Sequence, residues 1–212
     1  HSEQFYFFER YFSNSPDKHN WTWADIGACR GDTVSMFLHF IPEGHGQAFE
    51  PNPMNAQFLS EATAKIDRVK INNVAVGAKN EKVKFFFKQS KDSNEEFDNH
   101  YTGSIREQDF EQVNVHECEV ECVTLDSHYD GLPVDFIKLD VEGTEWEVLE
   151  GATSLLKRDI VWQIEFHLPA DWHKREMLYD FGYEIYDLNM NLLPRDCIMP
   201  NQTIVKRPDK KF

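Results

Sequence analysis

The feature that most constrains the fold is a glycine turn within residues 23–33, Trp-Ala-Asp-Ile-Gly-Ala-Cys-Arg-Gly-Asp-Thr. An apolar stretch leads into Asp25, Gly27 and Gly31 follow, and the apolar residues after Thr33 have helical spacing. We therefore expect a strand, a tight turn and the start of a helix. Such a turn brings backbone N–H groups close to a ligand, because glycine has no Cβ to hold the ligand away. The turn predicts a site for a nucleotide-like cofactor.

Charge and length limit what the chain can do. Its 212 residues suit a single domain over residues 1–212, and the formal net charge is -15 at pH 7. Nucleic acid is a polyanion, so average repulsion argues against it as a partner. No apolar run approaches the length of a membrane span. We therefore expect a soluble chain without membrane contact from this segment, and we favour the cytoplasm.

Hydrophobic periodicity predicts an α/β protein. Aromatic residues at Phe5, Phe8 and Phe12 predict an amphipathic helix over 3–12, within a helical extension of residues 1–20. After the strand and helix at the glycine turn, we expect strands at 46–50, 69–76, 82–88, 115–125, 134–143, 159–167, 183–188 and 202–206, and helices at 51–64, from 145 onward and at 173–181. Strands that alternate with helices in this way predict a parallel sheet.

One long stretch, residues 89–114, is polar and irregular. A loop of that length inside a compact domain is usually functional or simply flexible. We expect a lid or substrate loop here, with plain flexibility as the alternative. His100 and Tyr101 in this loop, and Trp172 in a second loop at 168–174, could stack on a sugar, although ordinary packing explains them equally well.

Polar side chains collect at the predicted carboxyl ends of five strands, at 25–31, 50–52, Asn73, 140–143 and 165–167. In an open parallel sheet, ligands bind outside these ends, near the point where the strand order reverses. The five groups therefore predict a single site.

The cofactor chemistry follows from two acids and a spacing. Glu50, at the end of the second strand, suits the two hydroxyls of a ribose. The spacing Gly-x-x-x-Gly lacks the middle glycine that close approach of a pyrophosphate requires, and Asp25 suits an ammonium group. S-adenosylmethionine, with ribose, ammonium and sulfonium groups, therefore fits better than NAD.

These segments, in this order, resemble the FkbM family of S-adenosylmethionine-dependent methyltransferases. The matching stretches are 25–32, 49–53, 73–77, 136–145, 148–152 and 164–167, and the resemblance covers about residues 22–206. The phrase from Phe136 to Ala152 is the most specific part. Cys29 departs from the family, in which an Asn is usual in that turn.

The resemblance implies a Rossmann-like class I methyltransferase, with a mostly parallel seven-stranded sheet, helices on both faces and a short N-terminal helix. It implies O-methylation of a hydroxyl on a sugar, glycan or other small molecule. The cofactor residues are expected at the strand ends and in the long loop. They are Asp25, Gly27, Ala28, Gly31, Thr33, Glu50, Pro51, Asn52, Asn73, Val74, Ala75, Ser104, Asp140 and Glu142.

Methyl transfer is an in-line displacement, so orientation supplies much of the catalysis, and a hydroxyl nucleophile also benefits from a base. We expect Asp140 beside the methyl group, His167 or Glu165 as the general base, and Lys138 in the same catalytic cluster. Asp140 and Glu142 would share a strand face if the strand extends that far, as would Glu165 and His167. The alternative is that Lys138 and Glu165 form a buried ion pair and His167 caps a strand end.

A divalent metal is the second alternative at this cluster. Asp140, Glu142, Glu165 and His167 are all suitable ligand types. We favour a site without metal.

Three other functions compete with small-molecule O-methylation. A nicotinamide oxidoreductase would share the sheet but needs a different glycine spacing. A ribose 2'-O-methyltransferase acting on RNA could use Lys138 and Asp140, although the net charge argues against it. A non-catalytic module that binds S-adenosylmethionine or a glycan would keep the turn without needing the base.

Overall fold

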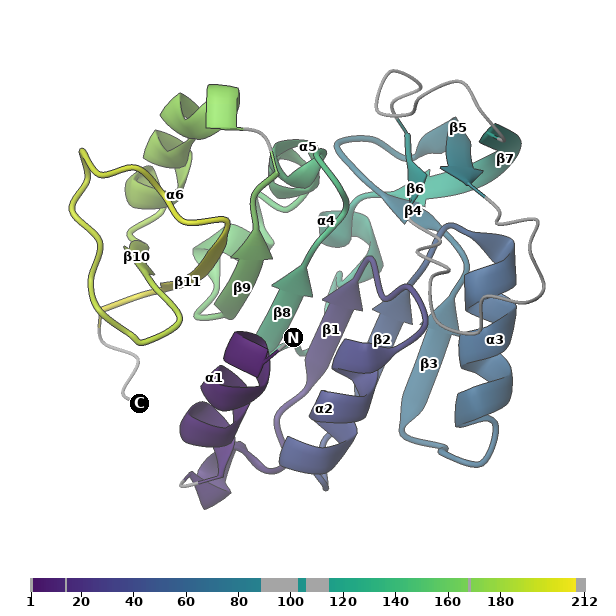
Figure 1. Ribbon diagram of the computed structural model, residues 1–212, viewed down its shortest axis with the longest axis horizontal. Helices are drawn as coiled ribbons and strands as arrows, with labels where there is room; N and C mark the ends of the chain where they lie inside the picture. Colours follow the sequence, from purple (N-terminus) through teal and green to yellow (C-terminus); the bar gives the residue numbers. More distant parts are fainter. Residues whose placement is uncertain (1, 14, 89–102, 106–114, 168, 209–212) are drawn as a thin grey trace.

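The computed structural model describes residues 2–13, 15–88, 103–105, 115–167 and 169–208 (Figure 1). Most of the predicted loop at 89–114, with His100 and Tyr101, lies outside the described residues. Within the described ranges, no helix has the length and apolar character that crossing a membrane requires.

Seven strands form the main sheet in the order β10-β11-β9-β8-β1-β2-β3. Their bounds are β1 Trp23–Ile26, β2 Gly46–Phe49, β3 Val69–Asn72, β8 Phe136–Leu139, β9 Val161–Glu165, β10 Glu184–Tyr186 and β11 Gln202–Lys206. The pairs among β3, β2, β1, β8 and β9 are parallel, whereas β11 is antiparallel to both of its neighbours. The prediction of a mostly parallel seven-stranded sheet is confirmed.

Helices cover both faces of this sheet (Figure 1). Helices α1 Ser2–Phe12, α2 Asp32–Phe40 and α3 Pro53–Thr63 contribute to one hydrophobic cluster with the strands. Helices α4 Leu125–His128, α5 Glu145–Glu150 and α6 Glu176–Asp180 contribute to the cluster on the other face. Short 3₁₀ helices at η1 Pro16–Lys18, η3 Leu155–Lys157 and η4 Pro169–Arg175 complete the described helical elements.

The predicted N-terminal helix is present, but its buried face differs from the prediction, which was wrong for Phe5 and lacked Phe7. Phe7, Phe8 and Phe12 are at most 1% exposed, whereas Phe5 is 42% exposed. The buried rings surround Phe136 of β8, with centroid separations between 5.4 and 6.4 Å. Aromatic contacts of this kind add to the free energy of burial. Helix α1 is therefore part of the core.

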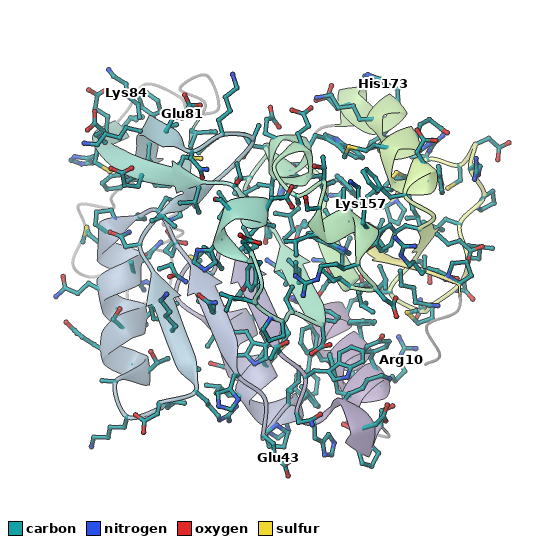
Figure 2. The ribbon with its side chains drawn as sticks, turned by 180° about the vertical axis from the view of Figure 1, so that it is seen from behind. Arg10, Glu43, Glu81, Lys84, Lys157 and His173 are labelled. Carbon is teal, nitrogen blue, oxygen red and sulfur yellow. The ribbon has the colours of Figure 1, made fainter. Side chains whose placement is uncertain are left out.

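A second sheet, absent from the predictions, sits beyond the carboxyl ends of the main strands (Figure 1). It contains β4 Ala75–Val76, β5 Glu81–Lys88, β6 Gly103–Ser104 and β7 Val115–Val123, in the order β4-β7-β5-β6. Glu81 and Lys84, labelled in Figure 2, lie on β5.

The single strand predicted at 69–76 is wrong, because β3 ends at Asn72 in the main sheet and β4 starts at Ala75 in the small one. At the break, Asn73 Nδ2 donates to the carbonyl oxygens of Glu50 (2.8 Å) and Pro51 (3.1 Å). The small sheet is thereby tied to the end of β2.

We predict that Phe136→Ala lowers the free energy of unfolding by about 3–5 kcal/mol, because it removes the ring around which α1 and α2 pack. Urea unfolding measures this change. The control Phe58→Ala, at a side chain 48% exposed on α3, should change stability by less than about 0.5 kcal/mol. Equal effects of the two substitutions would contradict the packing role of Phe136.

Candidate functional site

A pocket opens where the strand order reverses between β1 and β8, which is where open α/β sheets bind ligands. Its space is about 660 Å³, including the part continuous with solvent. The walls come from the ends of β1, β2 and β8, from β4 and from the small sheet. Its lining includes Gly27, Cys29, Phe49, Glu50, Val74, Val76, Phe85, Ser104, Ile105, Asp140 and Glu142.

Gly27 joins two of these walls. Its φ is +82°, and an added Cβ would lie 1.8 Å from the carbonyl oxygen of Asp140. The backbone N–H groups of Gly27 and Ala28 both donate to the carbonyl of Phe49 at 3.0 Å. Only glycine allows the turn after β1 to pack this closely on the end of β8.

Glu50 is held by backbone donors at the pocket wall. Its Oε2 accepts from the N–H of Cys29 (2.7 Å) and its Oε1 from the N–H of Asn52 (2.9 Å). Burial raises the pKa of Glu50 to about 7, although these two hydrogen bonds oppose the shift. The carboxylate is therefore fixed in position and costly to keep charged, which favours a ligand that donates hydrogen bonds to it.

The turn geometry explains why an Asn suits the position of Cys29. Cys29 has φ of 48°, in the left-handed region, where Asn is several-fold enriched among residues other than glycine. The contact to Glu50 uses the backbone N–H of Cys29. Cys29 thus keeps the backbone contact that an Asn would make there.

A row of buried polar groups runs beneath the pocket. Asp25 on β1 pairs in register with Lys138 on β8, and Lys138 Nζ lies 2.6 Å from Asp140 Oδ2. Asp25 is fully buried, and neither carboxylate oxygen has a hydrogen-bond partner among the described residues. Burial raises the pKa of Asp25 to about 7, with Lys138 opposing. Burial lowers the pKa of Lys138, but Asp140, Asp25 and Glu165 outweigh it, so that the ammonium stays charged.

Among the described residues, Lys138 and Glu165 do not form the ion pair that was the alternative prediction. Lys138 bonds to Asp140. Glu165 instead accepts a hydrogen bond on Oε2 from Gln202 Nε2 at 3.0 Å.

His167 stands at the centre of a cluster of four carboxylates. Its Nδ1 lies 2.9 Å from Oε1 of Glu145, a residue 1% exposed. Its Nε2 lies 3.4 Å from Glu142, 3.7 Å from Asp140 and 3.9 Å from Glu165. The hydrogen bond to Glu145 raises the pKa of His167 to about 9, against the effect of burial. The ring is therefore the imidazolium cation, protonated on both nitrogens, at neutral pH in this arrangement.

The chain reaches this arrangement differently from the prediction. Strand β8 ends at Leu139 and β9 at Glu165, so the predicted strands at 134–143 and 159–167 are too long. Glu142 has φ of 56° and Gly143 of 105°, and these residues turn the chain away from the strand. The shared strand faces predicted for Asp140 with Glu142 and for Glu165 with His167 are therefore wrong, but the turns still bring all four side chains together.

Sequence reasoning missed Glu145. Its Oε1 accepts hydrogen bonds from the N–H of Gly143 (2.9 Å) as well as facing His167. Acids in the first turn of a helix are common for electrostatic reasons alone, so its position gave no specific signal.

The predicted cofactor residues divide into two groups. Those that line the pocket are Gly27, Glu50, Pro51, Val74, Ala75, Ser104, Asp140 and Glu142. Those outside its lining are Asp25, Ala28, Gly31, Thr33, Asn52 and Asn73, whose direct ligand contacts stay predictions. Sequence reasoning placed the stretch 73–76 beside the adenine, and Val76 does line the pocket. It missed the apolar walls Phe49, Phe85 and Ile105, because apolar residues at such positions resemble ordinary core.

One group of described residues could hold a metal ion. Asp140, Glu145 and His167 each offer a ligand atom, and these atoms lie within 4.8 Å of one another. The predicted set shares Asp140 and His167 with this group. The expectation of a site without metal stays a prediction.

The sheet order and the pocket at the strand reversal are those of a Rossmann-like fold with a ligand site. Residues 25–187 match the family described as Methyltransferase FkbM domain, so the chain belongs to the FkbM methyltransferase family. The predicted family and fold class are confirmed.

Individual relatives are more distant. The 2-O-methyltransferase NoeI of Sinorhizobium fredii is 29% identical over 148 residues, and the match covers 63% of this chain and 58% of that relative. Among solved structures, precorrin-6y C5,15-methyltransferase of Geobacter metallireducens has 14% identity and a TM-score of 0.47, over 93% of this chain and 84% of the other. Fibrillarin of Aeropyrum pernix, in complex with S-adenosyl-L-methionine, has 18% identity and a TM-score of 0.47, over 90% of this chain and 67% of the other.

The pKa of His167 predicts how stability depends on pH. The folded-state pKa, about 9, is above the unfolded value of 6.5, so the stabilisation is complete below pH 6.5 and is lost as pH rises through 9. When the pH rises from 6.5 to 9, the unfolding free energy of wild type should fall by about 2 kcal/mol more than that of His167→Gln. Urea unfolding at the two pH values measures this. The control His39→Gln, at an exposed histidine, should retain the full fall, and the same retention in His167→Gln would contradict the Glu145 contact.

Proposed function

We propose that this chain is an S-adenosylmethionine-dependent O-methyltransferase whose acceptor is a hydroxyl of a sugar, glycan or other small molecule. The single observation that carries the proposal is the pairing of two features at one pocket. Glu50, held by backbone donors, lies on one wall, and Asp140 beside the His167 cluster lies on another. S-adenosylmethionine, when bound, supplies a methyl carbon already activated for displacement.

The pocket residues suit this cofactor chemically. Glu50 would accept hydrogen bonds from the ribose hydroxyls. Phe49, Val74 and Val76 offer apolar walls for the adenine. Asp140 lines the pocket, so its negative charge would favour a positively charged part of the ligand beside it.

His167 is the proposed general base, with its Nε2 as the proton acceptor. Glu145 orients the ring through Nδ1, as the acid does in a catalytic dyad with histidine. A ligand cation beside Asp140 would compete with the imidazolium for the same carboxylates and would lower the pKa of His167. Nε2 would then lose its proton more readily and could act as the base.

We predict that His167→Ala and Asp140→Asn each lower kcat by about 100-fold or more, since each removes a group at the reacting centre. S-adenosylhomocysteine release is measured with an acceptor panel of sugars, glycans, small alcohols and capped RNA. Calorimetry with S-adenosylmethionine checks that binding stays within a few-fold of wild type for His167→Ala. The control His39→Ala should keep full turnover. Full turnover in both site variants, with normal binding, would show that the assignment is wrong.

We predict that turnover is unchanged after dialysis against EDTA. The reason is that Glu145 Oε1 already accepts the N–H of Gly143 and lies against His167 Nδ1. Neither atom is then free to bind a metal ion. Loss of activity on chelation, restored by Mg²⁺ or Mn²⁺, would instead assign Asp140, Glu145 and His167 as metal ligands.

Two alternatives are separated by the same measurements. A non-catalytic binding module would bind S-adenosylmethionine without releasing S-adenosylhomocysteine with any acceptor. A ribose methyltransferase would prefer capped RNA in the panel, against the repulsion expected from a net charge of -15.

A further inference from the structure

A second cavity lies beside the His167 cluster, on the face of the sheet that α1 covers. Its space, again including the part continuous with solvent, is about 1230 Å³, which is enough for a ligand. Its walls come from α1, from the segment after β10 and from the start of β11, with Tyr6, Arg10, Asn189, Asn201 and Gln202 among the lining residues. These elements are different from the loops at 89–114 and 168–174 to which the sequence pointed.

Glu165 connects this cavity to the cluster. It lines the cavity, and its Oε2 accepts the hydrogen bond from Gln202. Its other oxygen, Oε1, lies 3.9 Å from Nε2 of His167. Asp140, also next to His167, lines the cofactor pocket. Nε2 of His167 is therefore within 4 Å of one carboxylate from each cavity lining.

The walls of the cavity are held in place. Arg10 on α1 donates through Nη2 to the carbonyl of Leu188 and to Oδ1 of Asn189, both at 3.0 Å. On the other side, the N–H of Phe166, the residue after β9, donates to the carbonyl of Asn201 at 2.7 Å. Preorganised walls lower the entropic cost of binding.

The lining has the chemistry of a site for an uncharged polyhydroxylated ligand. The Tyr6 ring is 59% exposed and offers a flat apolar face, while the amides of Asn201 and Gln202 offer both donors and acceptors. The charged residues of the lining are three acids, Glu3, Glu165 and Asp187, and one base, Arg10. Phosphate and carboxylate groups on a ligand would therefore meet net repulsion.

We propose that this cavity binds the acceptor, and that the acceptor is an uncharged sugar unit whose reacting hydroxyl lies between Glu165 and His167. The proposal rests on the proposed methyltransferase function. The proton leaves the hydroxyl oxygen for Nε2 of His167 as that oxygen forms its bond to the donor methyl carbon, and the carbon's bond to the donor sulfur breaks.

The test uses methyl glucoside, methyl galactoside and methyl mannoside as uncharged probes and glucose 6-phosphate as the anionic probe. Turnover and calorimetric binding, the latter with S-adenosylhomocysteine present, are measured for wild type, Tyr6→Ala and Asn201→Ala. We expect at least one glycoside to be methylated, with its KM raised ten-fold or more in both variants and cofactor affinity unchanged. The control Asn20→Ala, at an exposed residue outside the cavity, should match wild type.

Replacing an acid of the cavity by a lysine tests whether the lining selects against anionic ligands. Glu3→Lys should lower the KM for glucose 6-phosphate relative to Glu9→Lys, which makes the same change of net charge on α1 outside the cavity. Equal effects of these two variants would overturn the charge argument.

Two results would overturn the cavity assignment while leaving the methyltransferase function intact. The first is a glycoside KM that is unchanged in both Tyr6→Ala and Asn201→Ala. The second is methylation of other acceptors by a protein that binds none of the glycosides. Failure of the proposed function is distinguishable, because wild type would then release no S-adenosylhomocysteine with any acceptor; that result overturns this proposal as well.

Discussion

The arrangement of the site depends on one buried cation, the ammonium of Lys138. It is 5% exposed, lies on the central strand β8 and bonds to Asp140. The neighbouring strand β1 places the fully buried Asp25 in register with it. A buried carboxylate without a compensating charge is costly, so Lys138 is what allows two acids to lie at adjacent strand ends. The ion pair with Lys138 also holds the Asp140 side chain at the point where the chain leaves the sheet.

In the proposed mechanism, two ligand spaces approach that point. The cofactor pocket reaches Asp140, and the second cavity reaches Glu165, and both carboxylates face Nε2 of His167. Glu145 holds the ring from the opposite nitrogen. In this account, the fold supplies the donor site through the strand reversal and the acceptor site through α1, while a single histidine serves both. Helix α1, held by its rings around Phe136, lines the proposed acceptor cavity as well as contributing to the core.

The sequence predicted those parts of the molecule that depend on local geometry. The turn with Gly27 and the acid at Glu50 have fixed positions relative to their strands, so their place at the pocket followed from the parallel sheet. The break between Asn72 and Ala75 was missed, because two short segments rich in Val and Ile, separated only by Asn72 and Asn73, look like one continuous strand. Glu145 and the lining of the second cavity were missed for a different reason. Their partners are distant in sequence, as with Arg10 and Leu188, and periodicity carries no information on such contacts.

Binding of S-adenosylmethionine tests the central claim most directly. Calorimetric titration should give micromolar affinity for wild type, competition by S-adenosylhomocysteine and no binding of NAD. Glu50→Ala should weaken the affinity at least ten-fold, whereas Glu43→Ala, at the end of the molecule away from the small sheet (Figure 2), should leave it unchanged. Failure of the folded wild-type protein to bind S-adenosylmethionine at millimolar concentration, or equal affinities in Glu50→Ala and wild type, would contradict the account.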